Sequence, residues 1–277
     1  MMLSRFHIQN VSSTNNDLVS HDLTELIIIS GGEGWHQTEL VERPIRAGNV
    51  FVVNGNIAHT LVDGSGLCGY TILFDPARFV ELKHDLTSLP GYHALFTIEP
   101  LALENGENHP PLHLTETTLR TAIDIISEMQ DEYARQSPGF QTIITAYFFQ
   151  LVVYLSRQYV HSQTTDQIWR LSKVMAHIEI RYRDNITLEE LASIANMSIN
   201  HFMRSFKKLF MLSPIEYVIH LRLRKACELM QETDLAINRI AMQVGFSDGN
   251  YFARQFRKVM GRTPREFRRE IQSVVMD

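Results

Sequence analysis

The sequence predicts a multidomain α+β protein, with an N-terminal antiparallel β-sandwich or barrel, two appended helices and an all-helical C-terminal domain. Short β-rich runs separated by turn residues occupy about 20–80, and two helical segments follow at about 117–160. The rest of the chain is helical and contains an internal repeat with an offset of 49 to 50 residues. At 277 residues, the chain is long enough for two domains that each bury a core.

The predicted β domain consists of short strands between turns. The strand runs are LTELIIIS, WHQTELV, ERPIRAGN, VFVV, IAHTLVD and LCGYTILF, and the turns include GGEG, NGN and GSG. Strands interrupted about every eight to ten residues are typical of antiparallel sandwiches and barrels. The next segment, 76–114, includes DPARF, LPGYHALF and HPP and is predicted to be an irregular connection.

Two helices are predicted after this connection, at 117–136 and 140–160. The first is amphipathic, and its apolar stripe consists of Leu119, Ile123, Ile126 and Met129. The second is apolar on more than one face, with Tyr147, Phe148, Phe149, Leu151, Val152 and Val153. Such a helix is buried either inside the monomer or in a dimer interface, and both placements remain open. A homodimer is the expected assembly of this first domain, 1–161.

A polar linker at 162–168 is predicted between this domain and the C-terminal domain at 169–277. The charges differ on its two sides. Residues 1–166 contain 8 Lys and Arg against 19 Asp and Glu, whereas residues 167–277 contain 18 against 12. A basic domain indicates a polyanionic partner, although the same cations could form an ordinary solvated surface.

The cysteine content and hydropathy bear on the compartment. Cys68 and Cys227 lie one in each half, which excludes a disulfide framework and a cysteine zinc site and favours a reducing cytoplasm. No charged and apolar leader opens the chain, and no apolar run approaches the roughly 18 residues of a membrane span. We therefore expect a soluble cytoplasmic protein without a membrane partner.

The C-terminal repeat extends over three pairs of segments. They are LASIANMS and IAMQVGFS, SFKKLF and QFRKVM, and SPIEY and TPREF. The offset is 49 residues up to Ser198 and Ser247 and 50 residues beyond them. One residue has therefore been added just after the turn in the second copy.

Each copy has the organisation of a helix-turn-helix unit, with a short helix, a tight turn and a second helix. The units are predicted at about 187–210 and 237–260. Ser198 and Ser247 are suitable N-caps for the second helices, and Gly245 can adopt the positive φ that ends the helix before it.

The second helix of each unit has an apolar stripe opposite a polar face. The stripes are Phe202, Phe206 and Leu209 in the first unit and Phe252, Phe256 and Val259 in the second. The polar faces are Asn200, Arg204 and Lys207 in the first and Asn250, Arg254 and Arg257 in the second. Asn can pair with adenine, Arg with guanine and a cation with phosphate. A repeated face of this kind indicates double-stranded DNA as the partner, because two copies in register are unlike an ordinary surface helix.

The segment 214–232 between the units is predicted to be one helix about 28 Å long. This length is close to the roughly 34 Å repeat of duplex DNA, so one chain could place two helices in successive major grooves. Arg222, Arg224 and Lys225 on this helix either contact phosphate or are solvated, and the sequence favours neither.

A family resemblance is carried by Ile240, Ala241, Gly245, Phe246, Ser247, Tyr251, Phe252, Phe256, Arg257, Lys258, Gly261, Thr263, Pro264 and Phe267. The segment from about 170 to 270 resembles the bacterial AraC/XylS transcription regulators. This resemblance implies two helix-turn-helix units joined by a long helix, and an activator that contacts RNA polymerase. With the polar faces, it predicts DNA contacts by Asn200, His201, Met203, Arg204, Lys207, Lys208, Gly249, Asn250, Arg254, Arg257 and Lys258. Gly249 contributes no side chain to such contacts.

The strand pattern of the N-terminal half resembles the cupin barrel that many members of this family use as a sensor. Residues that match the spacing of cupin metal sites are His21, Glu25, Gly32, Gly48, His59 and Asp63. Val19, Asn54 and Asn56 stand where the cupin pattern has His, Pro and Gly. The resemblance therefore implies a sensor that keeps the fold without a metal, and no cofactor is expected.

A polar pocket for a small molecule is predicted in this barrel, lined by His21, Glu25, Trp35, His36 and His59. The alternative is that these histidines are exposed or satisfied structurally. The segments FVVNGNIAHTLVD, YTILFDPARF and LPGYHALFTIEP are similar to regulators of sugar catabolism of the rhamnose-operon type. This similarity implies a monosaccharide effector.

These observations predict a sequence-specific DNA-binding transcription activator that responds to a small molecule, and not an enzyme. Two alternatives remain open: a metal-dependent cupin enzyme with an accessory helical module, and a constitutive DNA-binding protein whose barrel only dimerises. A nucleophilic triad is not visible, and GGEG at 31–34 lacks the strand-loop-helix context of a phosphate loop.

Overall fold

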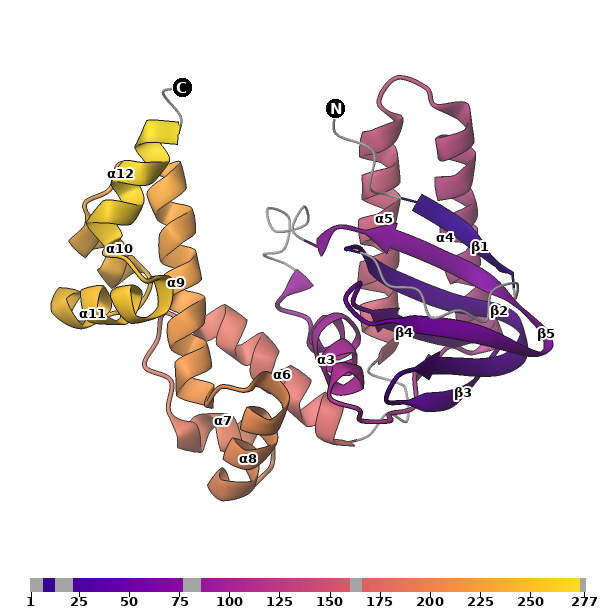
Figure 1. Cartoon of the computed structure of the whole chain (residues 1–277), viewed down its shortest axis with the longest axis horizontal. Coiled ribbons are helices and arrows are strands. Elements are labelled where there is room, and N and C mark those ends of the chain that lie inside the picture. Colours follow the sequence, from indigo (N-terminus) through magenta and orange to yellow (C-terminus); the bar gives the residue numbers. More distant parts are fainter. Residues whose placement is uncertain (1–6, 13–21, 77–85, 160–165, 275–277) are drawn as a thin grey trace. The chain divides into compact units, whose positions relative to one another are not determined.

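The structure, a computed structural model, describes residues 7–12, 22–76, 86–159 and 166–274 (Figure 1). His21 of the predicted pocket and most of the expected linker at 162–168 lie outside the described residues. The chain divides into two compact units, Met1–Ala176 and His177–Asp277. This division falls within helix α6 (Asp166–Arg181).

The N-terminal unit is built on one antiparallel sheet. Its strands are β1 (His7–Ser12), β2 (Thr24–Thr38), β3 (Glu42–Arg46), β4 (Asn49–Val53), β5 (His59–Phe74) and β6 (Leu112–His113). The described pairings follow the path β1-β5-β2-β4-β6, and β3 pairs with β2 beside it. The predicted antiparallel β architecture is confirmed, and β1 adds a strand before the expected start at about 20.

The two longest strands pass through segments that the sequence marks as turns. β2 and β5 pair along their length, with register shifts between Ile29 and Gly34. Gly32 has a φ of +70°, and a Cβ at this position would lie 2.2 Å from the Gly66 carbonyl oxygen. A Cβ on Gly34 would lie 2.2 Å from the Val62 carbonyl oxygen. The turns predicted at GGEG and GSG are therefore wrong, because their glycines form bulges where the two backbones come close.

The two helices predicted after the sheet are confirmed as α4 (Glu116–Arg135) and α5 (Phe140–Gln158), which run antiparallel to each other (Figure 1). Ala122 and Ile125 are buried on α4, whereas Ile123 of the expected stripe is only half-buried. The buried residues of α5 include Ile144, Phe148, Leu151, Val152 and Leu155. The apolar helix therefore buries much of its surface inside its own unit.

Three short helical segments cover 90–104, where the sequence predicts an irregular connection. They are α2 (Pro90–His93), the π-helix η2 (Ala94–Ile98) and α3 (Glu99–Glu104). Pro90 stands in the first turn of α2, where the missing N–H has no helical partner to lose. A Cβ on Gly91 would lie 1.8 Å from the Ser156 carbonyl oxygen, so this glycine lets α2 pack against α5. The prediction of an irregular connection is therefore wrong for 90–104. Pro90 is compatible with the first turn of a helix, and Gly91 allows that helix to pack against α5.

The described elements of the C-terminal unit are all helices, as predicted. After α6 they are α7 (Leu188–Ile194), α8 (Ile199–Phe210), α9 (Pro214–Glu232), α10 (Ile237–Gln243), α11 (Gly249–Met260) and α12 (Pro264–Val274). α7 and α8 form the first helix-turn-helix unit, and α10 and α11 form the second. The connecting helix α9 has the bounds predicted for it.

The two units share the same turn geometry. Asn196 and Gly245, 49 residues apart, both adopt left-handed φ values, of 50° and 94°. In each turn the N–H of the following residue donates to a carbonyl of the first helix, over 3.0 Å in the first unit and 2.9 Å in the second. The positive φ predicted for Gly245 is confirmed.

The second helix of a helix-turn-helix unit is termed its recognition helix, and these helices are α8 and α11 here. Their N-caps differ by one residue position. Ser198 caps α8, and its side chain accepts a hydrogen bond from the His201 N–H. α11 is capped by Asp248, whose side chain accepts from the Asn250 N–H, so the prediction of Ser247 as the N-cap is wrong. Asp248 is the residue added in the second copy. Because Asp caps as well as Ser, the insertion moves the start of the helix by one position.

Candidate nucleic-acid interface and ligand site

α8 presents the predicted polar face to the surface. Phe202 and Phe206 are fully buried, and Leu209 is 6% exposed, so this side of the helix belongs to the core. The residues predicted to contact DNA are all exposed: Asn200, His201, Met203, Arg204, Lys207 and Lys208. The Arg204 side chain donates from Nε to the Asn200 carbonyl oxygen over 3.3 Å, which holds its guanidinium along the helix surface.

α11 repeats this arrangement. Phe252 and Phe256 are fully buried, and Val259 is half-buried. The predicted DNA contacts Asn250, Arg254, Arg257 and Lys258 are exposed, and Gly249 at the first helical position is half-buried. The Arg254 guanidinium lies 5.9 Å from the centre of the Tyr251 ring. Both recognition helices therefore expose an Asn, an Arg and further cations on matching faces.

A surface groove of about 770 Å³ lies at the N-terminal end of α11. Gly249 and Asn250 line it, together with Arg265 and Arg268 of α12. A Cβ on Gly249 would lie 3.0 Å from Asn238 Oδ1, so the glycine keeps this part of the groove open. Sequence reasoning missed Arg265 and Arg268, although the basic run in TPREFRRE could have indicated them.

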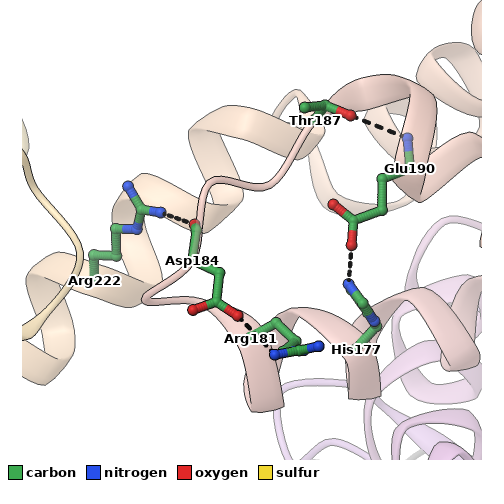
Figure 2. Close-up of polar contacts among 6 residues, drawn as sticks. All are labelled: His177, Arg181, Asp184, Thr187, Glu190 and Arg222. Atoms are coloured by element: carbon green, nitrogen blue, oxygen red, sulfur yellow. Dashed lines mark hydrogen bonds and ion pairs between the residues drawn. The ribbon is translucent and has the colours of Figure 1, made fainter.

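The first helix-turn-helix unit is held to the end of α6 by polar contacts, which Figure 2 shows. His177 Nε2 lies 2.8 Å from Glu190 Oε1 on α7. Thr187 caps α7 by accepting from the Glu190 N–H over 3.2 Å. Arg181 Nη1 donates to Asp184 Oδ2 over 3.0 Å. The His177–Glu190 contact therefore joins α7 to α6, and the Thr187 cap stabilises the start of α7.

The cations of α9 are engaged inside the C-terminal unit. Arg222 is half-buried and donates from Nε and Nη2 to two backbone carbonyl oxygens. Arg224 lies 3.4 Å from Glu179, and Lys225 lies 2.8 Å from Glu228. The alternative of a fully solvated Arg222 is wrong, and a phosphate contact by these cations stays a prediction.

A polar cluster lies inside the N-terminal unit and brings together three of the five predicted pocket residues. His59 Nε2 lies 3.5 Å from Glu25 Oε1, and the rings of His36 and His59 are 5.4 Å apart. Glu25 and His59 are each 9% exposed, and His36 is fully buried. Trp35 is 43% exposed and points away from His36, because neighbours in a strand face opposite sides of the sheet.

Arg43 completes this cluster, and sequence reasoning missed it. Its Nε donates to His36 Nδ1 over 3.1 Å, and its guanidinium lies 4.6 Å from the centre of the Phe51 ring. Burial, with the charges of Arg43 and His59, lowers the pKa of His36 well below its usual range, so the ring is neutral. His36 Nε2 has no hydrogen-bond partner among the described residues. It can therefore bond to a polar group of a bound molecule.

Glu99 is a second buried acid close to Arg43. Tyr159 donates its hydroxyl to Glu99 Oε1 over 2.6 Å, and Tyr159 stacks on Trp169 with ring centres 6.3 Å apart. Burial raises the pKa of Glu99 to about 7, against the smaller lowering effects of the Tyr159 hydrogen bond and the Arg43 charge. The carboxyl group therefore titrates close to neutral pH.

The raised pKa of Glu99 makes the stability of the protein depend on pH. Because the folded-state pKa lies above the ordinary value of 4.5, the contribution is fully present below about pH 4.5 and is lost as pH rises through about 7. Gln does not ionise, so the Glu99→Gln protein should not lose this contribution. Its free energy of unfolding relative to wild type should therefore rise by on the order of 1 kcal/mol between about pH 5 and pH 8. Thermal unfolding followed by circular dichroism at both pH values measures this change. Glu128→Gln, at an exposed site on α4, is the control, and an equal pH dependence in all three proteins would refute the assignment.

Among the described residues, no cluster of three or more His, Cys, Asp and Glu side chains has an arrangement that could hold a metal ion. Within the same residues, no helix has both the length and the apolar character needed to cross a bilayer. Cys68 is exposed and Cys227 is buried, and both are free thiols.

Comparison with known families and proteins matches both units. Residues 17–152 match the model of the AraC-like ligand binding domain, and residues 191–270 match a helix-turn-helix domain model. The HTH-type transcriptional activator RhaS of Enterobacter sp. is 26% identical over 250 residues, which cover 90% of this chain and 86% of the relative. The HTH-type transcriptional activator RhaR of Mannheimia succiniciproducens is 24% identical over 249 residues, with 90% and 85% covered.

Among solved structures, an AraC-type transcriptional regulator from Chromobacterium violaceum is 28% identical, with a TM-score of 0.35, and the match covers 37% of this chain and 91% of that one. The helix-turn-helix match spans the two recognition helices, and the ligand-binding match spans the sheet with its polar cluster. Transcription regulators of this kind are not enzymes, which removes the cupin-enzyme alternative. The chain belongs to the AraC family of DNA-binding transcription regulators and carries an AraC-like ligand-binding domain.

Proposed function

We propose that this regulator activates transcription by inserting α8 and α11 into two successive major-groove segments of one DNA site. The observation that carries the proposal is the matched exposed face of the two helices, with Asn200 and Arg204 repeated by Asn250 and Arg254. Their side chains suit adenine and guanine edges, and the cations beside them suit phosphate. Helix α9, about 28 Å long, gives a spacing close to one helical turn of DNA.

Lys207 tests the division between phosphate contacts and base contacts. Lys207→Ala should weaken binding to specific and random duplexes alike, and should reduce the slope of log affinity against log salt by about 1. Fluorescence anisotropy titrations at several salt concentrations measure both quantities. The control is Lys225→Ala, which removes a lysine already paired with Glu228. A loss confined to the specific duplex would place Lys207 at a base edge instead.

We also propose that the N-terminal unit binds a small polyhydroxylated effector, with a monosaccharide as the leading class. The polar cluster supports this proposal, because Glu25 and His59 offer hydrogen-bonding groups near Arg43, and His36 Nε2 is unpaired among the described residues. The resemblance to regulators of sugar catabolism supports the choice of sugars. Thermal-shift assays of the purified protein across a panel of monosaccharides test it.

Matched variants show whether the thermal shift comes from binding at the polar cluster. Glu25→Gln and His59→Gln should reduce the shift produced by an active sugar, whereas Glu128→Gln on the exposed side of α4 should not. A flat response across the panel would favour a constitutive DNA-binding protein whose N-terminal unit only dimerises.

Two partners follow from this proposal. A homodimer formed through the α4–α5 hairpin is supported by its exposed apolar residues Ile143 (45% exposed) and Tyr133 (39% exposed). RNA polymerase is the expected partner of an activator of this family. Sedimentation equilibrium tests the dimer, and in vitro transcription with purified polymerase tests activation.

A further inference from the structure

The turn that follows α6 is bonded to the connecting helix α9 through a single arginine. Arg222 donates from Nε to the Tyr182 carbonyl oxygen over 2.6 Å and from Nη2 to the Asp184 carbonyl oxygen over 2.7 Å. Figure 2 shows the second of these contacts. Both carbonyls belong to the turn after the last residue of α6, where the helical hydrogen bonds have ended. The planar guanidinium can satisfy both at once, which an ammonium group cannot do in the same geometry.

The same turn touches the second helix-turn-helix unit. A Cβ on Gly245 would lie 2.6 Å from the Arg183 carbonyl oxygen, so the turn between α10 and α11 packs directly on this backbone. The Arg222 guanidinium lies 5.7 Å from the centre of the Phe246 ring. Phe246 is 3% exposed and its ring centre lies 5.2 Å from that of Phe252 on α11. Arg222 therefore lies against Phe246, which in turn packs on the buried Phe252 of α11.

The first helix-turn-helix unit is attached to α6, the helix that this turn directly follows. Asp184 accepts from Arg181, and His177 contacts Glu190 on α7 (Figure 2). The first unit is therefore joined to α6, while the second unit and α9 contact the turn at 182–184 that continues from α6. A rotation of one unit against the other would break the Arg222 hydrogen bonds or separate its guanidinium from Phe246.

We infer that Arg222 is a positioning residue that sets the distance and angle between α8 and α11, and hence the spacing between the two DNA segments that they contact. The inference rests on the proposed contact of both helices with one DNA site. Arg222 itself does not contact DNA in this scheme, because its Nε and Nη2 groups bond to carbonyls and its guanidinium lies against an aromatic ring. A rigid connection of this kind makes affinity depend sharply on spacing, whereas a flexible one does not.

The test uses the full-length protein and the two-segment duplex that wild type selects from random DNA. Affinity is measured for this duplex, for versions with the spacer one base pair longer or shorter, and for a version with one segment scrambled. Wild type should lose about tenfold or more when the spacer changes. Arg222→Lys should lose no more than about threefold on the same change, while its affinity for the single-segment duplex stays within about twofold of wild type.

Two further variants make the result decisive. Arg224→Lys, on the same helix but paired with Glu179, should keep the wild-type spacing dependence. Phe246→Leu removes the ring beside the guanidinium and leaves both hydrogen bonds possible, so it should also reduce the spacing dependence. If thermal unfolding shows that Arg222→Lys does not fold, the Phe246→Leu variant alone tests the inference.

The outcomes separate this inference from the proposed function. An unchanged spacing dependence in Arg222→Lys and Phe246→Leu would overturn the positioning role and leave two-helix binding intact. Equal losses on the single-segment and two-segment duplexes would also overturn it, because they indicate a direct DNA contact or a general loss of structure. If wild type bound both duplexes equally, the two-helix proposal would fail, and the inference would fail with it.

Discussion

Replacement of both Arg204 and Arg254 by alanine should lower the affinity for the selected two-segment duplex by about 2 to 6 kcal/mol and leave random-duplex binding nearly unchanged. Each arginine is exposed at the equivalent position of its recognition helix, and a good bidentate contact with guanine contributes about 1 to 3 kcal/mol of discrimination. The single variant Arg254→Ala should cost about half as much and relax the preference at one base pair. Anisotropy titrations on both duplexes at one fixed salt concentration measure these effects.

The control for this prediction is Arg120→Ala, which removes an exposed arginine of α4 in the N-terminal unit. It should change neither affinity. Equal losses on specific and random duplexes in the Arg204 and Arg254 variants would contradict the assigned faces, since they are expected of phosphate contacts.

Gly245→Ala should destabilise the C-terminal unit by about 3 kcal/mol. The left-handed conformation costs an L-residue about 1 to 2 kcal/mol, and the added Cβ would in addition lie 2.6 Å from a backbone oxygen that cannot move alone. Asn196→Gly, at the equivalent position of the first unit, should change stability by less than about 1 kcal/mol, because Asn already tolerates this conformation. Urea unfolding of wild type and both variants measures the difference.

A Gly245→Ala protein as stable as wild type would show that the turn shifts away from the 182–184 backbone. Such a result would also weaken the positioning role of Arg222, because both depend on the same close packing.

The C-terminal unit was largely predictable because its signals are local. The spacing of Phe202 and Phe206 along one helix defines the buried face of α8, and the repeat transfers the same assignment to α11. The N-cap at Asp248 could have been found from the offset, since the inserted residue lies just before the helix. The role of Arg222 could not be found in this way, because its carbonyl partners lie 40 and 38 residues before it and Phe246 lies 24 residues after it.

The N-terminal unit was less predictable because its features depend on pairing between distant segments. The bulges of β2 follow from the close approach of β5, and the glycines alone read as turns. Arg43 and Glu99 meet only in the folded unit, and no sequence pattern joins them. The alternation of side chains along a strand was available, and it places Trp35 and His36 on opposite faces.

The most direct test of two-helix DNA binding is selection of binding sites from random duplex DNA by the full-length protein, with and without a pool of monosaccharides, at one stated salt concentration. The predicted result is a motif of two conserved segments about one helical turn apart, enriched more strongly when the active sugar is present. A motif with a single segment, or no enrichment under either condition, would contradict the claim that α8 and α11 both contact the bases of one site.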